Sequence, residues 1–201
     1  MLISVKNKEI LHHILLVDNY DSFTYNLSHY LEGMNCSVDV VRNNEVDLDK
    51  LLDYDAIILS PGPGLPKEHV NLMEIIQICE GKLPVLGVCL GMQAIALHLG
   101  GDIENKSAVM HGMEEMINVV NHDGLFVELP RKLKVGLYHS WKVQESHNYR
   151  SDAFAVSDNT LMAISYSSKL LYGIQFHPES IMTEHGREML QNFLATKKGN
   201  Q

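Results

Sequence analysis

The segment LPVLGVCLGMQAIAL, residues 83–97, decides the fold of this chain. Its first part, 83–88, is an apolar run of the kind that forms a buried strand, and the pattern over 91–99 is that of a helix. Cys89 falls between the two, with a glycine two residues away on each side. Such glycines let the backbone turn sharply, as in the G-x-S-x-G elbow that presents a nucleophile at the top of a sheet. The segment therefore predicts a strand, a tight turn that carries a cysteine, and a helix.

Two interpretations of Cys89 are open on this segment alone. Free cysteine is among the most often buried residue types and usually packs as a small apolar side chain. At a strand-to-helix turn, however, the thiol lies at a helix N-terminus, whose partial positive charge favours the nucleophilic thiolate. Neighbouring groups must decide between a core thiol and a nucleophile.

The alternation of strands and helices extends toward the N-terminus. Apolar runs predict strands, and amphipathic stretches predict helices, with a helix ending near Leu31 and a Pro-Gly loop at 60–64. The predicted strands are Ile14–Val17, Cys36–Val41 and Ala56–Leu59, and further helices are predicted at Val46–Leu52 and 70–79. This order indicates βαβ units with right-handed crossovers and a mostly parallel sheet.

After about residue 101 the pattern changes to short alternating segments. These predict strands joined by turns, some of them antiparallel, followed by a last helix. The strands are expected at Glu115–Val120, Phe154–Ser157, Leu161–Tyr166 and Leu171–Phe176, and the helix at about Thr183–Thr196. We expect one α/β domain over residues 1–201: an open, mostly parallel, twisted sheet with helices on both faces. Residues 1–13 form an N-terminal lead to which no role is assigned.

Composition narrows the possible partners and compartments. The formal net charge is −9, which argues against nucleic acid and anionic membrane surfaces as main partners. No run approaches the roughly 20 apolar residues needed to cross a bilayer, and the N-terminus lacks a signal-peptide pattern. Three irregularly spaced cysteines suit a reducing compartment, so we expect a cytoplasmic protein. There is no Cys-x-x-Cys motif, and no His-x-x-x-His motif on a predicted helix, so we expect no metal site.

The loops at 18–22, 60–66 and 88–91 follow three predicted parallel strands, and ligands bind at the carboxyl ends of such strands. His177-Pro178-Glu179 also follows an apolar run. A nucleophilic cysteine needs a base and a third group that orients the base, and His177 and Glu179 offer both. A surface loop is the alternative reading of these three residues. Beside a cysteine elbow on the same sheet, the catalytic reading is favoured.

The Ser60-Pro61-Gly62-Pro63-Gly64 loop has three readings. It can be a plain turn, since Pro-Gly repeats are turn signals. It can supply a backbone N–H to a developing oxyanion, with the N–H of Leu90 as the second donor. A dinucleotide fingerprint is discounted, because Lys67 occupies the place of its last glycine.

Two further groups have an open role. Gln93 lies one helical turn after Cys89 and is either solvated or part of a polar pocket. The segment Tyr138-His139-Ser140-Trp141 carries the only tryptophan and is either core packing or a pocket wall. Spacing alone does not decide either case.

Three motifs together resemble the class I, or triad, glutamine amidotransferases. They are Gly87-Val88-Cys89-Leu90-Gly91-Met92-Gln93, Ser60-Pro61-Gly62-Pro63-Gly64 and Gln175-Phe176-His177-Pro178-Glu179-Ser180. The resemblance runs from about Ile14 to Leu194 and implies the flavodoxin-like sheet of that family. Two more stretches, 18–27 and Val109-Met110-His111-Gly112, are similar to the small subunits of anthranilate synthase and para-aminobenzoate (aminodeoxychorismate) synthase.

The resemblance implies a role for each matching residue. Cys89 would attack the side-chain amide of L-glutamine, His177 would move the proton to the leaving ammonia, and Glu179 would orient His177. The implied oxyanion donors are the N–H groups of Gly62 and Leu90. The implied glutamine-binding residues are Gly62, Pro63, Gly64, Gln93, Ser140 and Trp141.

The resemblance also implies a partner, a larger synthase subunit that binds and aminates chorismate. Mg²⁺ would belong to that subunit, and this chain would need no cofactor of its own. Two alternatives keep the fold: a stand-alone γ-glutamyl or other cysteine hydrolase, and a non-catalytic assembly subunit. The intact Cys89, His177 and Glu179 argue against the second.

Overall fold

The structure is a computed structural model that describes residues 11–199, except for the side chains of 107–111. It is built on one nine-stranded sheet. The strands are β1 His12–Asp18, β2 Cys36–Arg42, β3 Ala56–Leu59, β4 Val85–Val88, β5 Ile103–Val119, β6 Lys132–Val143, β7 Arg150–Ala155, β8 Leu161–Tyr166 and β9 Leu171–Ile174. The α-helices are α1 Thr24–Glu32, α2 Leu72–Cys79, α3 Leu90–His98 and α4 Gly186–Leu194.

The strand order is β2-β1-β3-β4-β9-β8-β7-β5-β6. Strands β2, β1, β3, β4 and β9 pair in parallel, and β8, β7, β5 and β6 continue the sheet by antiparallel pairing. The expected α/β class, with antiparallel strands in the C-terminal half, is confirmed. Four of the strand pairs are parallel and four are antiparallel, so the sheet is mixed.

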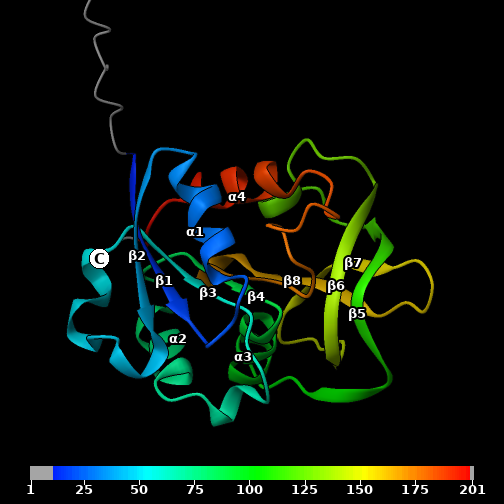
Figure 1. Cartoon of the computed structure of the whole chain (residues 1–201), viewed down its shortest axis with the longest axis horizontal. Coiled ribbons are helices and arrows are strands. Elements are labelled where there is room, and N and C mark those ends of the chain that lie inside the picture. The colour runs from blue at the N-terminus through cyan, green and yellow to red at the C-terminus, as the bar shows by residue number, and fades with distance from the viewer. Residues whose placement is uncertain (1–10, 200–201) are drawn as a thin grey trace, which may run out of the picture.

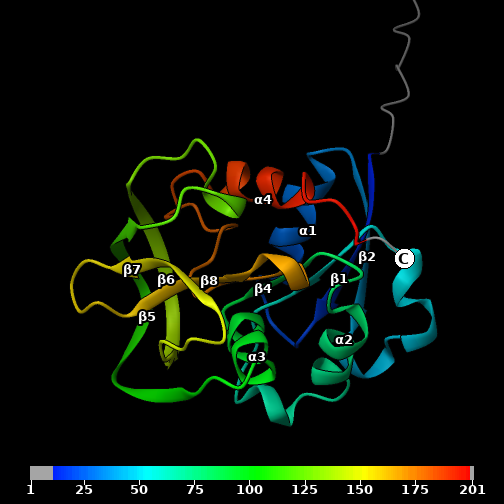
Figure 2. The same cartoon turned by 180° about the vertical axis from the view of Figure 1, so that it is seen from behind.

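Helices cover both faces of the parallel part (Figures 1 and 2): α1 and α4 lie on one face, and α2 and α3 on the other. The middle of β1, residues 14–17, is an unbroken apolar run because both of its faces are buried. Ile14 and Leu16 belong to the core cluster that contains α1 and α4 residues. Leu15 and Val17 belong to the cluster that contains α2 and α3 residues. A strand buried on both faces cannot show the polar alternation of a half-exposed strand.

The parallel strands bring four loops to one edge of the sheet. Strands β1, β3, β4 and β9 run in the same direction, so the segments that follow them meet at their carboxyl ends. These segments begin at Asn19, Ser60, Cys89 and Gln175. The predicted convergence of the loops after β1, β3 and β4 is therefore confirmed.

Several elements differ from the sequence expectation. The helix expected at Val46–Leu52 is a 3-10 helix over Leu48–Asp53. The strand expected at Glu115–Val120 is the end of the 17-residue β5, which pairs with the unpredicted β6. This hairpin has a partly exposed face and irregular register, which weakens the two-residue alternation that identifies strands. The Val109-Met110-His111-Gly112 stretch lies in β5, and the side chains of its first three residues are outside the described part.

Candidate active site

Cys89 lies on a strained turn between β4 and α3. Its backbone has φ +52° and ψ −102°, a region that residues other than glycine rarely adopt. A Cβ on Gly87 would lie 2.2 Å from the backbone of Gly91, and a Cβ on Gly91 would lie 2.6 Å from the Leu59 carbonyl oxygen. Only glycine fits at both positions, so the elbow predicted from the sequence is confirmed.

The Cys89 thiol is in contact with a buried amide. Gln175 Nε2 donates a hydrogen bond of 3.4 Å to Cys89 Sγ. Gln93 Nε2 in turn donates to Gln175 Oε1 at 3.5 Å and to the Trp141 carbonyl at 3.3 Å. Gln93 therefore faces the interior beside the site and is not a solvated helix residue. No role was predicted for Gln175, which is fully buried in the structure, although an amide within the apolar run before His177 was a usable signal in the sequence.

His177 and Glu179 form a buried pair. His177 Nδ1 lies 2.7 Å from Glu179 Oε1, and the two side chains are 2% and 0% exposed. Their proximity comes from a turn, closed by the Ser180 N–H to the His177 carbonyl at 3.2 Å, and not from the extended segment that was expected. His177 Nε2 is buried and has no hydrogen bond of good geometry to another described residue. It is the ring nitrogen left for chemistry.

The charge state of His177 follows from its neighbours. Burial lowers its pKa, but the Cys89 thiol and the Glu179 carboxylate outweigh burial, so the pKa is raised above its ordinary value of 6.5. Both neighbours favour the imidazolium because each is an acceptor or anion next to the ring. The arrangement suits a cysteine nucleophile paired with a histidine that is oriented by a carboxylate.

Two aromatic side chains hold the His177 ring edge-on. The Tyr138 ring centroid lies 4.8 Å away and the Phe23 centroid 5.5 Å away, and these two rings are 5.1 Å apart. Phe23 precedes α1, and Tyr138 belongs to β6. The sequence did not identify Phe23 as a site residue, because this contact joins segments more than 150 positions apart.

The Pro-Gly loop after β3 lies against the start of α3. A Cβ on Gly62 would lie 2.7 Å from both Leu90 Cδ2 and the Asn19 carbonyl oxygen, so this position accepts only glycine without a shift. The Leu90 N–H is in the first turn of α3, where amide groups have no partner within the helix. Gly62 and Leu90 are thus neighbours beside Cys89, as an oxyanion pair requires.

A cavity of about 180 Å³ opens onto Cys89. It is lined by Gly62, Pro63, Gly64, Cys89, Gln93, Tyr138, His139, Ser140 and Trp141. Every residue predicted to bind glutamine is among them, while their binding roles stay predictions. The Tyr138–Trp141 segment, whose place was open, forms a wall of this cavity. The volume is below the 300–1,000 Å³ of pockets for drug-sized ligands and suits a molecule of amino-acid size.

The buried His139 predicts a pH dependence of stability. Burial lowers its pKa from 6.5 to about 4, against the hydrogen bond to the Trp141 carbonyl. The unfolded chain therefore binds a proton that the folded chain does not, and stability falls as the pH drops from about 6.5 toward 4. Between pH 7 and pH 5 we expect this group to cost about 2 kcal/mol.

Denaturant unfolding of the wild type and of His139→Asn at both pH values measures this cost. Asparagine can still donate to the carbonyl but does not titrate. The raised pKa of His177 acts in the opposite direction and is common to both proteins. An equal pH dependence in the two proteins would contradict the expectation.

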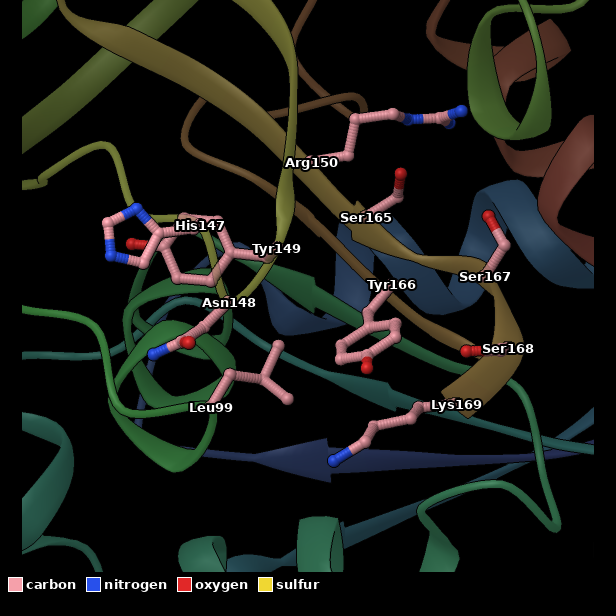
Figure 3. A pocket seen from close by; sticks show the side chains of 10 residues that line it. All are labelled: Leu99, His147, Asn148, Tyr149, Arg150, Ser165, Tyr166, Ser167, Ser168 and Lys169. Carbon is pink, nitrogen blue, oxygen red and sulfur yellow. The ribbon is translucent and has the colours of Figure 1, made fainter.

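A larger cavity lies elsewhere in the described structure. It has about 640 Å³ and is lined by Leu99 and by residues 147–150 and 165–169 (Figure 3). Its two long cations are already paired: Arg150 with Asp123 and Asp152, and Lys169 with Glu80. None of the described residues that line it is a cysteine, so we assign the chemistry to the smaller cavity.

The described residues have neither a metal-binding cluster nor a membrane-spanning helix. No group of three or more His, Cys, Asp or Glu side chains is placed to hold a metal ion there. Within residues 11–199, no helix has the length and apolar character needed to cross a bilayer.

Comparisons with known proteins show the family of this chain. The sequence model of the family described as "Glutamine amidotransferase class-I" matches residues 15–197. The anthranilate synthase component 2 of Lactococcus lactis subsp. lactis is 40% identical over 185 residues, which cover 90% of this chain and 93% of that protein. The aminodeoxychorismate/anthranilate synthase component 2 of Bacillus subtilis is 41% identical over 191 residues, which cover 91% and 96%.

A solved structure extends the comparison to the fold. The glutamine amidotransferase of Thermotoga maritima has a TM-score of 0.76 at 16% identity, with 91% of this chain and 98% of that chain covered. The matched residues 15–197 include the four carboxyl-end loops of the sheet. The chain belongs to the class-I glutamine amidotransferase family.

Proposed function

We propose that this chain is the glutamine-hydrolysing subunit of a synthase that aminates chorismate. The observation that carries the proposal is the convergence of the Cys89 elbow and the buried His177–Glu179 pair beside a cavity of amino-acid size. The relatives named anthranilate synthase component 2 and aminodeoxychorismate/anthranilate synthase component 2 support the type of synthase. Because this chain supplies only ammonia, the partner's active site determines which aromatic product forms.

The first half of the reaction releases ammonia. The Cys89 thiolate attacks the side-chain carbonyl carbon of glutamine, and the electron pair of the C=O bond moves onto oxygen. The N–H groups of Gly62 and Leu90 stabilise this oxyanion. The imidazolium of His177 then gives its proton to the amide nitrogen as the C–N bond breaks, which leaves a γ-glutamyl thioester on Cys89 and free ammonia.

The second half restores the enzyme. His177, now neutral, takes a proton from water, and the resulting hydroxide attacks the thioester carbonyl within the same oxyanion site. The C–S bond breaks, glutamate leaves, and Cys89 returns as the thiolate opposite the imidazolium. Glu179 keeps the ring oriented through both steps. Nothing in this sequence needs a metal, so we propose that the chain uses no cofactor and that a chelator leaves glutamine hydrolysis unchanged.

The dimensions of the site favour free glutamine over the alternative substrates. A stand-alone γ-glutamyl hydrolase would accept peptides or folate polyglutamates, which exceed a cavity of about 180 Å³. A partner-independent rate on such substrates would favour that alternative. The described cysteines are all free, which fits the proposed location in the reducing cytoplasm.

Exposed apolar residues near the site suggest where the synthase subunit docks. Ammonia is mostly protonated in neutral water and is then not a nucleophile, so it needs a shielded path to its acceptor. Tyr20 and Tyr25 flank Phe23 and are 50% and 61% exposed, and Ile181, four residues after His177, is 99% exposed. We propose that the partner covers this edge of the sheet.

Glutamine hydrolysis is therefore expected to be weak for the isolated chain and to rise when the synthase subunit is added. Ile181→Asp places a charge on the proposed interface, where charged residues are depleted. It should weaken assembly at least tenfold in a binding titration and leave the basal activity of the isolated chain unchanged. The matched control is Val127→Asp, which alters an exposed apolar residue outside the carboxyl-end loops. Equal binding by Ile181→Asp and the wild type would contradict the proposed interface.

A further inference from the structure

A hydrogen-bonded chain links the two ends of the Pro-Gly loop. Asn19 Nδ2 donates to the Ser60 carbonyl at 2.9 Å, and Asn43 Nδ2 lies 3.1 Å from Asn19 Oδ1 and 2.9 Å from His69 Nδ1. His69 Nε2 lies 2.7 Å from the Pro63 carbonyl oxygen. The chain thus runs from Ser60, before Gly62, to Pro63, directly after it.

Both ends of this chain are backbone carbonyls, and carbonyls only accept hydrogen bonds. Asn19 must therefore turn its NH₂ group to Ser60 and its oxygen to Asn43, so Asn43 must donate to Asn19. The same NH₂ group of Asn43 faces His69, which must then accept at Nδ1 and donate from Nε2 to Pro63. Each of the four contacts then has one donor and one acceptor, and His69 is the neutral tautomer with its proton on Nε2. If one of these side chains were turned around, two donors or two acceptors would face each other.

Burial makes the hydrogen-bonded chain stiff at its Ser60 end. Asn19 and Ser60 are 0% exposed and Asn43 is 1% exposed. The Asn19 N–H also donates to Ser60 Oγ at 2.9 Å. Gly62 lies directly against Asn19, because a Cβ at Gly62 would be only 2.7 Å from the Asn19 carbonyl oxygen. A shift of Asn19 or Pro63 would therefore move the Gly62 N–H relative to Leu90.

We propose that Asn43 and His69 are positioning residues for the oxyanion site, and that neutral His69 fixes the outer end of the Pro-Gly loop. The inference rests on the proposed function, because it takes the Gly62 N–H as an oxyanion donor. His69 does not touch the Cys89 cavity. It follows the 3-10 helix Pro66–Glu68 and is half-buried, so its replacement leaves the core intact.

The test compares His69→Ala with His69→Gln in the full chain. Glutamine can accept with its carbonyl oxygen and donate with its NH₂ group, as the neutral ring does. For His69→Ala we expect kcat for glutamine hydrolysis to fall about tenfold, less than the loss of 10²–10³ on direct removal of an oxyanion donor. KM should stay within about twofold, since the affected interaction forms in the transition state. His69→Gln should recover most of kcat.

Alkylation of Cys89 by iodoacetamide separates positioning of the oxyanion site from general damage. This displacement forms no oxyanion, so its rate should be the same in the wild type and in His69→Ala. The matched control is His98→Ala, which removes a histidine bonded to Glu80 at 2.5 Å near the end of α3 and should change neither rate.

Three results would overturn the inference: an unchanged kcat in His69→Ala, an equal fall in hydrolysis and alkylation, or no recovery in His69→Gln. The proposed function would fail differently. In that case the wild type itself would be alkylated at Cys89 and yet would not hydrolyse glutamine even with the synthase subunit added.

Discussion

Replacing Cys89 with alanine is expected to abolish glutamine-dependent amination while ammonia-dependent amination by the assembled synthase continues. Loss of the nucleophile should lower glutamine turnover by a factor of about 10⁴ or more. Ammonium salt bypasses this chain, because the partner then takes ammonia from solution. The measurement assays the copurified complex with glutamine and then with ammonium salt.

Cys79→Ala is the matched control. Cys79 is fully buried on α2, and burial raises its pKa to about 12, so its thiol stays protonated and takes no part in the reaction. This variant should keep glutamine-dependent activity. Glutamine-dependent turnover that survives Cys89→Ala would mean that Cys89 is not the nucleophile. Loss of both activities would point to an assembly role instead.

Replacing His177 with alanine should lower glutamine turnover by about 10³-fold or more, because the thioester can then neither form nor break with proton transfer. The pKa of His177 is raised by Cys89 and Glu179 against burial, so at neutral pH the ring is charged and favours the thiolate. Its removal should slow alkylation of Cys89 by iodoacetamide at pH 7.

Glu179→Gln gives a graded comparison for His177→Ala. It keeps an oxygen that can accept from His177 Nδ1 but removes the charge, so its loss of turnover should be smaller. His147→Ala, which alters an exposed histidine, serves as the control and should behave as the wild type. Alkylation of His177→Ala at pH 7 at the wild-type rate would contradict the pairing of thiolate and imidazolium.

Local sequence was enough for the elbow and for the parallel half of the sheet. Glycine is required on both sides of Cys89 because a Cβ at Gly87 or Gly91 would lie 2.2 or 2.6 Å from backbone atoms. A steric requirement of this kind is visible in the sequence as a glycine. Strand β1 is apolar on both faces because each face meets a different helical layer. Short segments of this kind are determined by their own neighbours in the chain.

The rest of the site depends on contacts between distant segments. Phe23, Gln175 and His139 lie beside the predicted residues only because β1, β9 and β6 bring them there. The long β5–β6 hairpin was incomplete in the prediction because its irregular register breaks the alternation of buried and exposed residues. Position in the sheet, and not residue type, makes these groups part of the site.

The hydrogen-bonded chain between the Ser60 and Pro63 carbonyls could not be predicted from the sequence either. Asn19 and Asn43 directly follow strands β1 and β2, and both are buried donors in the structure. Amides near strand ends are common in turns, so their sequence gives no sign of this role. The structure assigns it through the carbonyls at each end.

The central claim, that Cys89 carries the glutamyl group during turnover, is tested most directly by trapping the intermediate. The wild-type chain is mixed with glutamine and quenched in acid within one turnover. The protein is then digested, and the masses of its peptides are measured by mass spectrometry. We expect the peptide that contains Cys89 to carry a γ-glutamyl group that hydroxylamine removes, as a thioester requires. Glutamate production with that peptide unmodified at every quench time would contradict the claim.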